Sequence, residues 1–475
     1  MDWTQFCDTE IRYFKLFLPI VIEMVSVMLT STITTFYSAK IGDDYIVTGV
    51  GIATLLNIGV LYGFILGYGT VFDSYAGTVK ASNGDGALGG LVVKCSIQGF
   101  IIYLLSLFPY AWCGYLVHLF GDDERVHDVA LLYMKLECAR PILLYLRDLL
   151  VKYLVVQGFP LTSLLIAVLA LPTHLILGWF CVVHMEWGLY GLAGAQIGNS
   201  TLFVLILVLV CLWKRYELKW EIPCNSLTSG WGEMLKLGCF SGLRVTATYG
   251  LLISSHIFSQ SSGIITAEAV VVLDKITLPF FASIFAGGYA VAMLIGQALG
   301  NADKNRYKYI IKLGLLNWVV ERCITIVIYI FTMISLAKLF TENEEVLKEM
   351  RSAIPAMGAM LVVAALDELL ARGILTPLGK QVFVGLATMV SIYLIGIPLM
   401  VGLIFILRAK ASSIFWCFVV SNVVQCVAYL VRIYSINIDK EMDECRDRTS
   451  HQQSEISETV PLSHRSINHN DKPME

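Results

Sequence analysis

The chain has 475 residues, of which 57% are hydrophobic and 15% are charged, and its mean hydropathy is +0.71. Soluble globular proteins carry about 25% charged residues, so this composition excludes a soluble enzyme and indicates a chain surrounded by lipid. The net charge of -3 and the lack of basic runs with interleaved aromatic residues exclude nucleic acid as a partner.

Twelve apolar runs follow one another along the chain. Each is long enough to cross about 30 Å of hydrocarbon as a helix of about 20 residues. The first six lie near 14–37, 46–72, 91–117, 131–156, 160–184 and 188–213. After a polar connection, six more lie near 232–258, 264–296, 310–337, 352–375, 381–407 and 411–434. We therefore predict an all-α integral membrane protein with about twelve transmembrane helices.

Basic residues collect in the connections on one side of these spans. Lys214 and Arg215 follow the sixth span, and Lys304 and Arg306 follow the eighth. Acidic residues such as Glu344 occupy the alternate side. Because basic connections stay in the cytoplasm, we expect both termini there. The plasma membrane is the expected location, with an intracellular vesicle membrane as the alternative.

Two sequence patterns recur about six spans apart: one follows the second and eighth spans (77–85 and 296–303), and the other follows the fourth and tenth. Gln157-Gly158, after the fourth span, is echoed by Arg372-Gly373 after the tenth. An offset of six helices relates two bundles of the same orientation, as in carriers that rock one half against the other. We therefore divide the chain into a cytoplasmic N-terminus (1–9), a first lobe (10–213), a cytoplasmic linker (214–231), a second lobe (232–435) and a disordered cytoplasmic tail (436–475).

The twelve cysteines are scattered singly, without a CxxC pair or a Cys/His cluster at metal-binding spacing. No metal site is therefore expected. The chain also lacks the HxxxxD and HExxH patterns of enzymes, and we expect no catalytic residues. A monomer in the lipid bilayer is the expected state.

Several segments resemble the multidrug and toxin extrusion (MATE) family, and its eukaryotic branch in particular. They are GQALGNAD at 296–303, VKYLVVQG at 151–158 with Pro160, GYG at 67–69 through Asp73, and GLYGLAGA at 188–195. Pro19 and Gly42 also fit, and the resemblance covers residues 10–435 in register with all twelve spans.

The resemblance implies two pseudo-symmetric six-helix lobes that face a central cavity. It also implies export of organic compounds, mostly cations, in exchange for protons or sodium ions, with no cofactor beyond that coupling ion. The alternative is a divergent member that moves anionic or zwitterionic metabolites. Three acidic positions depart from the family pattern: one is Thr248, a second falls beside Asp274 and Lys275, and a third falls near Ala365.

Ionisable residues inside a span cost about 2.5–3.5 kcal/mol on insertion, so each is a functional candidate. The candidates for binding a proton or a cation are Asp274, Glu23, Asp367 and Glu368. Glu23 has no obvious partner. Asp274 is free to titrate if Lys275 pairs with Glu268, and is otherwise part of a static ion pair. Asp367 and Glu368 either bind protons or pair with Arg372.

The fourth span carries Glu137, Arg140, Arg147 and Asp148 within about 100° of one helix face. Opposite charges on one face favour pairing with each other and with a neighbouring span. The alternative is a role in gating the two lobes. Pro141 lies within this face and is expected to kink the helix.

Five further residues are predicted to line the cavity: Arg244, Thr248, Tyr249, Lys275 and Tyr289. Tyrosine rings can hold organic cations, whereas the basic residues favour the anionic or zwitterionic alternative. Arg244 can instead lie near the cytoplasmic end and extend its charged group toward water.

Overall fold

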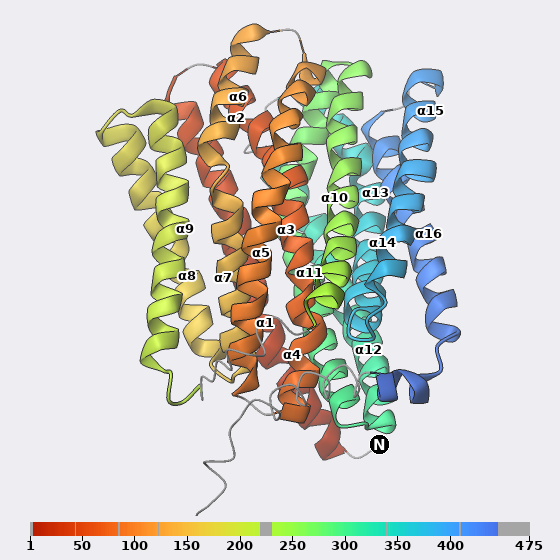
Figure 1. Cartoon of the computed structure of the whole chain (residues 1–475). Coiled ribbons are helices and arrows are strands. Elements are labelled where there is room, and N and C mark those ends of the chain that lie inside the picture. The colour runs from red at the N-terminus through yellow and green to blue at the C-terminus, as the bar shows by residue number, and fades with distance from the viewer. Residues whose placement is uncertain are drawn as a thin grey trace, which may run out of the picture.

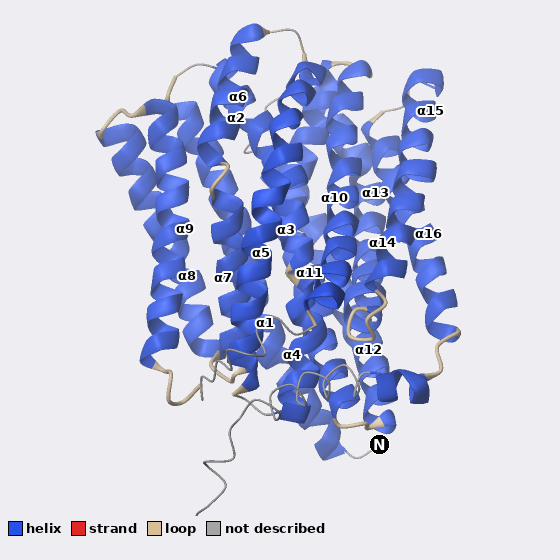
Figure 2. Cartoon of the chain, in the orientation of Figure 1, coloured by secondary structure: helices blue, strands red, loops and turns tan. Residues whose placement is uncertain are grey.

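The computed structural model describes residues 3–42, 44–83, 86–121, 123–218, 230–338, 341, 343–407 and 410–444. These residues form helices joined by short connections and contain no strand, as Figure 2 shows. Helices suit a lipid environment because each one pairs its backbone groups internally. The all-α prediction is therefore confirmed.

The first lobe contains six helical spans. They are α1 (Trp3–Lys40); α2 (Asp44–Leu56) with η1 (Asn57–Tyr62), α3 (Gly63–Tyr68) and α4 (Thr70–Asn83); α5 (Ala87–Trp112) with η2 (Cys113–Phe120); α6 (Glu124–Glu137) with α7 (Arg140–Val156); α8 (Pro160–Gly178) with η3 (Trp179–His184); and α9 (Gly188–Trp213).

The second lobe repeats this arrangement with six more. They are α10 (Trp231–Ser261); α11 (Ile264–Gly300); α12 (Lys304–Ala337); α13 (Glu344–Glu368) with η5 (Leu369–Leu375); α14 (Gln381–Met389) with η6 (Val390–Gly396) and α15 (Ile397–Leu407); and α16 (Ala411–Tyr434). Figure 1 shows the lobes side by side, with the first in red to yellow and the second in green to blue.

Ten of these spans in the described residues are long and apolar enough to cross a membrane by length and composition. The other two are α6–α7, which is divided into two shorter helices and carries Glu137, Arg140, Arg147 and Asp148, and α10, which carries Arg244. The fourth span breaks at Cys138–Ala139, and Pro141 lies in the first turn of α7. The predicted kink is therefore present, at a point where proline costs no helical hydrogen bond.

We call the end of the bundle at which α1 and α12 begin the lower end, and the opposite end, where α6 and α11 begin, the upper end (Figure 1). Residues 438–444 form a short helix at the lower end, where Glu441 pairs with Lys380 at 2.7 Å. The prediction of disorder from residue 436 is wrong for this segment, because an ion pair anchors it. The predicted tail beyond 444 lies outside the described residues.

At the lower end, the two lobes pack closely against each other at glycine residues. Helix α4 packs against α11, and α3 packs against α10. A Cβ atom on Gly77 of α4 would lie 2.8 Å from the carbonyl oxygen of Met293 and 2.9 Å from the Cα of Gly296. Only glycine allows this close approach of two helix backbones, as in other membrane helix pairs. The contact seals the seam between the lobes below mid-depth.

Replacing Gly77 with Ala is expected to push α4 away from α11, because the added methyl group meets backbone atoms that cannot turn aside. Overpacking of this kind costs about 1–3 kcal/mol, so the thermal unfolding midpoint in detergent should fall. Gly51→Ala is the matched control, since its added Cβ has no atom within 4 Å. Equal midpoints for the two variants would contradict the glycine seam.

Candidate functional site

A cavity lies between the lobes near mid-depth, with an empty volume of about 730 Å³ that includes space open to solvent. The first lobe contributes Glu23, Met24, Val27, Met28, Ser31, Ile58, Tyr62, Leu66, Arg140, Leu144 and Asp148, and the second contributes Tyr249, Leu278 and Phe285. A concave, largely apolar space with a few polar groups is the usual form of a small-molecule site. We take this central cavity as the candidate functional site.

Both carboxylates of the central cavity are paired with basic residues behind the wall. Glu23 forms an ion pair with Arg147 at 2.8 Å, and Asp148 forms one with Lys152 at 2.6 Å. The side chains of Arg147 and Lys152 are 2% and 0% exposed. The expectation that Glu23 lacks a partner is wrong, because α7 supplies one from another span.

The pairing continues from the cavity into the second lobe. Lys152 lies 3.4 Å from Asp73 of α4, and Asp73 accepts both Nε and Nη2 of Arg372 at 2.9 and 2.6 Å. Asp73 is fully buried. Because Asp73 belongs to the first lobe and Arg372 to η5 of the second, this ion pair crosses the seam.

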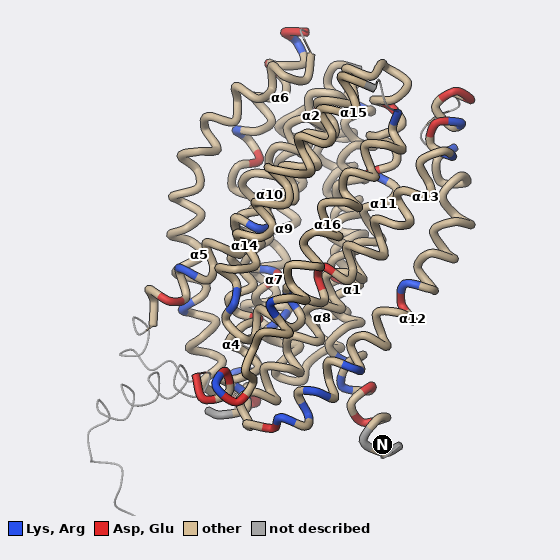
Figure 3. The backbone as a smooth tube through the Cα atoms, turned by 90° about the vertical axis from the view of Figure 1, so that its right-hand side faces the viewer, with Lys and Arg blue, Asp and Glu red and all other residues tan. Residues whose placement is uncertain are grey.

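The same network ends on α10. Arg372 contacts Glu368 at 3.4 Å, and Arg244 donates to Glu368 and Asp367 at 2.7 and 2.9 Å. The side chain of Arg244 is 11% exposed, so it pairs inside the bundle and does not extend to water. We call the connected set the cross-lobe ion-pair chain: Asp148, Lys152, Asp73, Arg372, Glu368, Arg244 and Asp367. Figure 3 shows charged positions inside the bundle as well as at its ends.

The polar face of the fourth span divides between two places. Asp148 belongs to the cross-lobe ion-pair chain and Arg147 pairs with Glu23, whereas Glu137 and Arg140 pair with each other at 3.6 Å nearer the upper end. The predicted pairing with a neighbouring span is present in Arg147–Glu23. The predicted role of this face in gating the two lobes stays a prediction. The ion pair between Lys152 and Asp73 connects the fourth span to the seam where such gating would act.

Asp274 lies apart from the central cavity. Its carboxylate is 3.4 Å from Nε2 of His256 on α10, a contact that neither of the two alternatives for Asp274 included. His256 was not among the predicted site residues, although a histidine inside an apolar run is itself a signal. Lys275 is partly buried beside Asp274.

The remaining predicted lining residues occupy different positions. Tyr249 lines the central cavity. Thr248 is exposed and donates to the carbonyl of Arg244 at 3.1 Å. Tyr289 is buried at the seam, where its hydroxyl donates to the carbonyl of Lys152 at 3.4 Å. In the part of the chain that the structure describes, Tyr249 is thus the member of the predicted lining set that reaches this cavity.

Comparisons with known proteins give one family. The MatE family profile matches residues 19–180 and 244–401. Multidrug and toxin extrusion protein 1 of Danio rerio is 22% identical over 95% of this chain and 76% of its own length. Protein DETOXIFICATION 7 of Arabidopsis thaliana is 21% identical over 90% of this chain and 86% of its own length.

A solved structure has the same fold. The eukaryotic MATE transporter AtDTX14 superposes with a TM-score of 0.85 over 93% of this chain and 99% of its own, at 18% identity. At that level of identity the likeness establishes the fold, with its two six-helix lobes. The nature of the cargo has to be argued from the residues of the site.

Proposed function

This chain belongs to the multidrug and toxin extrusion (MATE) family of transporters, and from that premise we propose that it exports organic cations in exchange for protons. Members of the family are transporters and not enzymes. The cargo and the coupling ion are our proposal. They rest on the central cavity and on the cross-lobe ion-pair chain below it.

The lining of the central cavity supports a cationic cargo. Glu23 and Asp148 place two carboxylates on its wall, against one arginine, Arg140. Tyr62 and Tyr249 add aromatic rings from opposite lobes. Rings of this kind attract organic cations through their π faces. This pair of carboxylates facing aromatic side chains is the observation that carries the proposal.

The seam at the lower end supports alternating access. Basic residues such as Lys304 and Lys380 lie at that end, which we therefore assign to the cytoplasm. Glycine packing and the Asp73–Arg372 pair close the cytoplasmic side beneath the cavity. Rocking of the lobes must break this pair to open the cytoplasmic side.

Exchange follows from competition at one carboxylate. Glu23 or Asp148 binds either a proton or the cationic cargo, because the two positive charges repel each other at close range. The two facings differ in affinity for each ligand, and this difference shifts the populations of the states. An exchange of one cation for one proton is electrically silent, and one pH unit then supports about a tenfold concentration ratio.

Uptake into proteoliposomes under an imposed pH gradient tests the cargo. We expect tetraethylammonium, a cation, to accumulate in exchange for protons. Benzenesulfonate, an anion, should not accumulate. The contrary result, accumulation of benzenesulfonate alone, would favour the anionic alternative. Accumulation that follows a sodium gradient instead of the pH gradient would show that the coupling ion is sodium and not the proton.

A further inference from the structure

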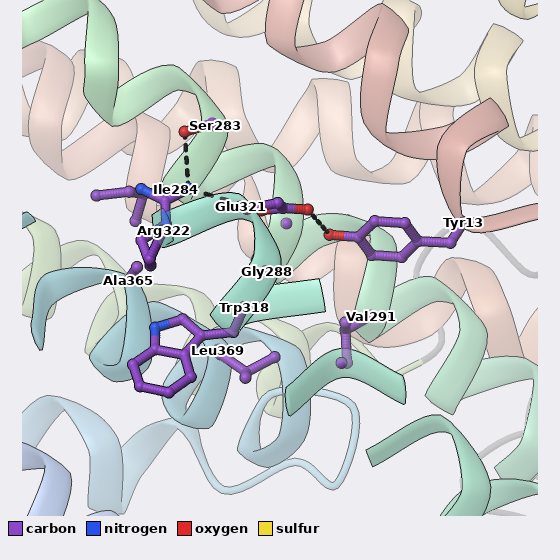
Figure 4. Close-up of a pocket in the computed structure, with 12 residues that line it drawn as sticks. Tyr13, Ser283, Ile284, Gly288, Val291, Trp318, Glu321, Arg322, Ala365 and Leu369 are labelled. Carbon is purple, nitrogen blue, oxygen red and sulfur yellow. Dashed lines mark hydrogen bonds and ion pairs between the residues drawn. The ribbon is translucent and has the colours of Figure 1, made fainter. Parts of the chain in front are cut away.

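A second crevice lies at the seam between α1 and the second lobe and shares no lining residue with the central cavity (Figure 4). Its empty volume is about 260 Å³. Helices α1, α11, α12 and α13 contribute side chains to it, and η5 adds Leu369. Two ionisable residues of α12, Glu321 and Arg322, stand in its wall, about halfway along a membrane-spanning helix.

Glu321 is held by the opposite lobe. The hydroxyl of Tyr13 on α1 donates to Oε1 of Glu321 at 2.6 Å, and Figure 4 shows the two side chains pointing toward each other. Nearer the lower end, Asn317 donates to Glu10 at 3.2 Å and extends the polar line. Both contacts cross from the second lobe to α1, so rocking of the lobes must separate them.

Arg322 is not a tight counter-ion for Glu321. Its Nη2 donates to Ser283 at 2.8 Å, whereas its closest contact with Glu321 is 3.6 Å. Its Nε and Nη1 have no hydrogen-bond partner, and the residue is 3% exposed. The carboxylate is therefore neutralised incompletely from within its own helix.

Two glycines separate this crevice from the cross-lobe ion-pair chain. A Cβ atom on Gly287 would lie 3.5 Å from Oε2 of Glu321, and one on Gly288 would lie 3.0 Å from Cγ of Glu368. The backbone of α11 alone thus stands between the crevice and Glu368 at this level. Glycine here brings the two charged regions close together.

We propose that Glu321 is a second proton-binding site, at the lobe seam, whose ionised form holds α1 against the second lobe. The inference rests on the proposed exchange with protons. The charged and titratable groups that face Glu321 are Tyr13 and Glu10 on α1, Arg322 on α12, and Glu368 with Arg372 behind α11. Helix α13 presents only Ala365 to the crevice.

The direction of the coupling follows from the hydrogen bond. A hydroxyl donates more strongly to an ionised carboxylate than to a neutral carboxyl group. Ionised Glu321 therefore favours the state closed at the lower end, and protonation of Glu321 weakens the contact with Tyr13 and favours opening. This order matches an exchanger in which the proton-loaded protein turns toward the cytoplasm.

The test combines two measurements on purified full-length protein without any cargo. Infrared titration detects the carboxyl group, and hydrogen exchange of α4, corrected for the intrinsic effect of pH on exchange, reports opening of the lower end. In the wild type, we expect a protonated carboxyl band to appear as pH falls and α4 exchange to rise at least about tenfold over the same interval.

Glu321→Gln should lose that band and the pH dependence of α4 exchange. Tyr13→Phe should keep the band and lose most of the change in exchange. Glu345→Gln, at an exposed position, is the control and should behave as the wild type. An unchanged band and unchanged α4 response in Glu321→Gln would overturn the proposal. Neither readout involves transport, so a failure of the proposed cargo or coupling ion would appear separately, in the flux assay.

Discussion

Asp73→Asn is expected to lower transport at least tenfold and to destabilise the closed lower end. Asp73 is the shared counter-ion of Lys152 and Arg372, and all three side chains are at most 5% exposed. Removing one partner from a buried ion pair costs about 3–5 kcal/mol. Arginine does not give up its proton, so the excess positive charge stays at the seam. Flux into proteoliposomes and the thermal unfolding midpoint measure the two effects.

Two further variants sharpen this prediction. Arg372→Gln should have a smaller effect, because it leaves Asp73 paired with Lys152 and Glu368 paired with Arg244. Asp123→Asn removes an exposed pair with Arg125 in an upper connection and should leave the flux and the thermal unfolding midpoint close to those of the wild type. If Asp73→Asn matched Asp123→Asn in flux and stability, the cross-lobe ion-pair chain would have no role in closure.

Glu23→Gln is expected to weaken binding of an organic cation by about 10- to 100-fold. Two opposite unit charges about 4 Å apart attract each other by roughly 1–4 kcal/mol at effective dielectric constants of about 80 to 20, and the change also leaves Arg147 without its counter-charge at the cavity wall. The concentration of tetraethylammonium that gives half-maximal uptake measures the loss.

Asp274→Asn is the matched comparison for Glu23→Gln. Asp274 pairs with His256 and does not line the central cavity, so its loss should change half-saturation by less than about threefold, which is under 1 kcal/mol. A larger effect at Asp274 than at Glu23 would move the cation site to the second lobe.

The helices were predictable because an apolar run of about 20 residues is a local property of the sequence. The fourth and seventh spans are helical as predicted, although they fall outside the ten that are long and apolar enough by themselves to cross a membrane. The break before Pro141 was also predictable, since proline acts on its own helix. The resemblance of short Gly-rich segments indicated the family in the same local way.

The partners of the charged residues were not predictable in this way. Glu23 meets Arg147 from a different span, and Asp73 meets Arg372 from the other lobe. Such pairs depend on how helices rotate and tilt against one another. The residue periodicity within a single helix does not determine that arrangement. The same limit explains why the prediction placed Tyr289 in the cavity lining. Its aromatic ring is suited to a cation, but in the structure it faces Lys152 at the seam.

The most direct test of the proposed exchange is to record tetraethylammonium uptake and internal pH together in one population of wild-type proteoliposomes. The account predicts that the interior becomes more alkaline as the cation enters, because a proton leaves for each cation, and that clamping the membrane potential at zero changes neither rate. Uptake of tetraethylammonium with no change in internal pH would contradict it.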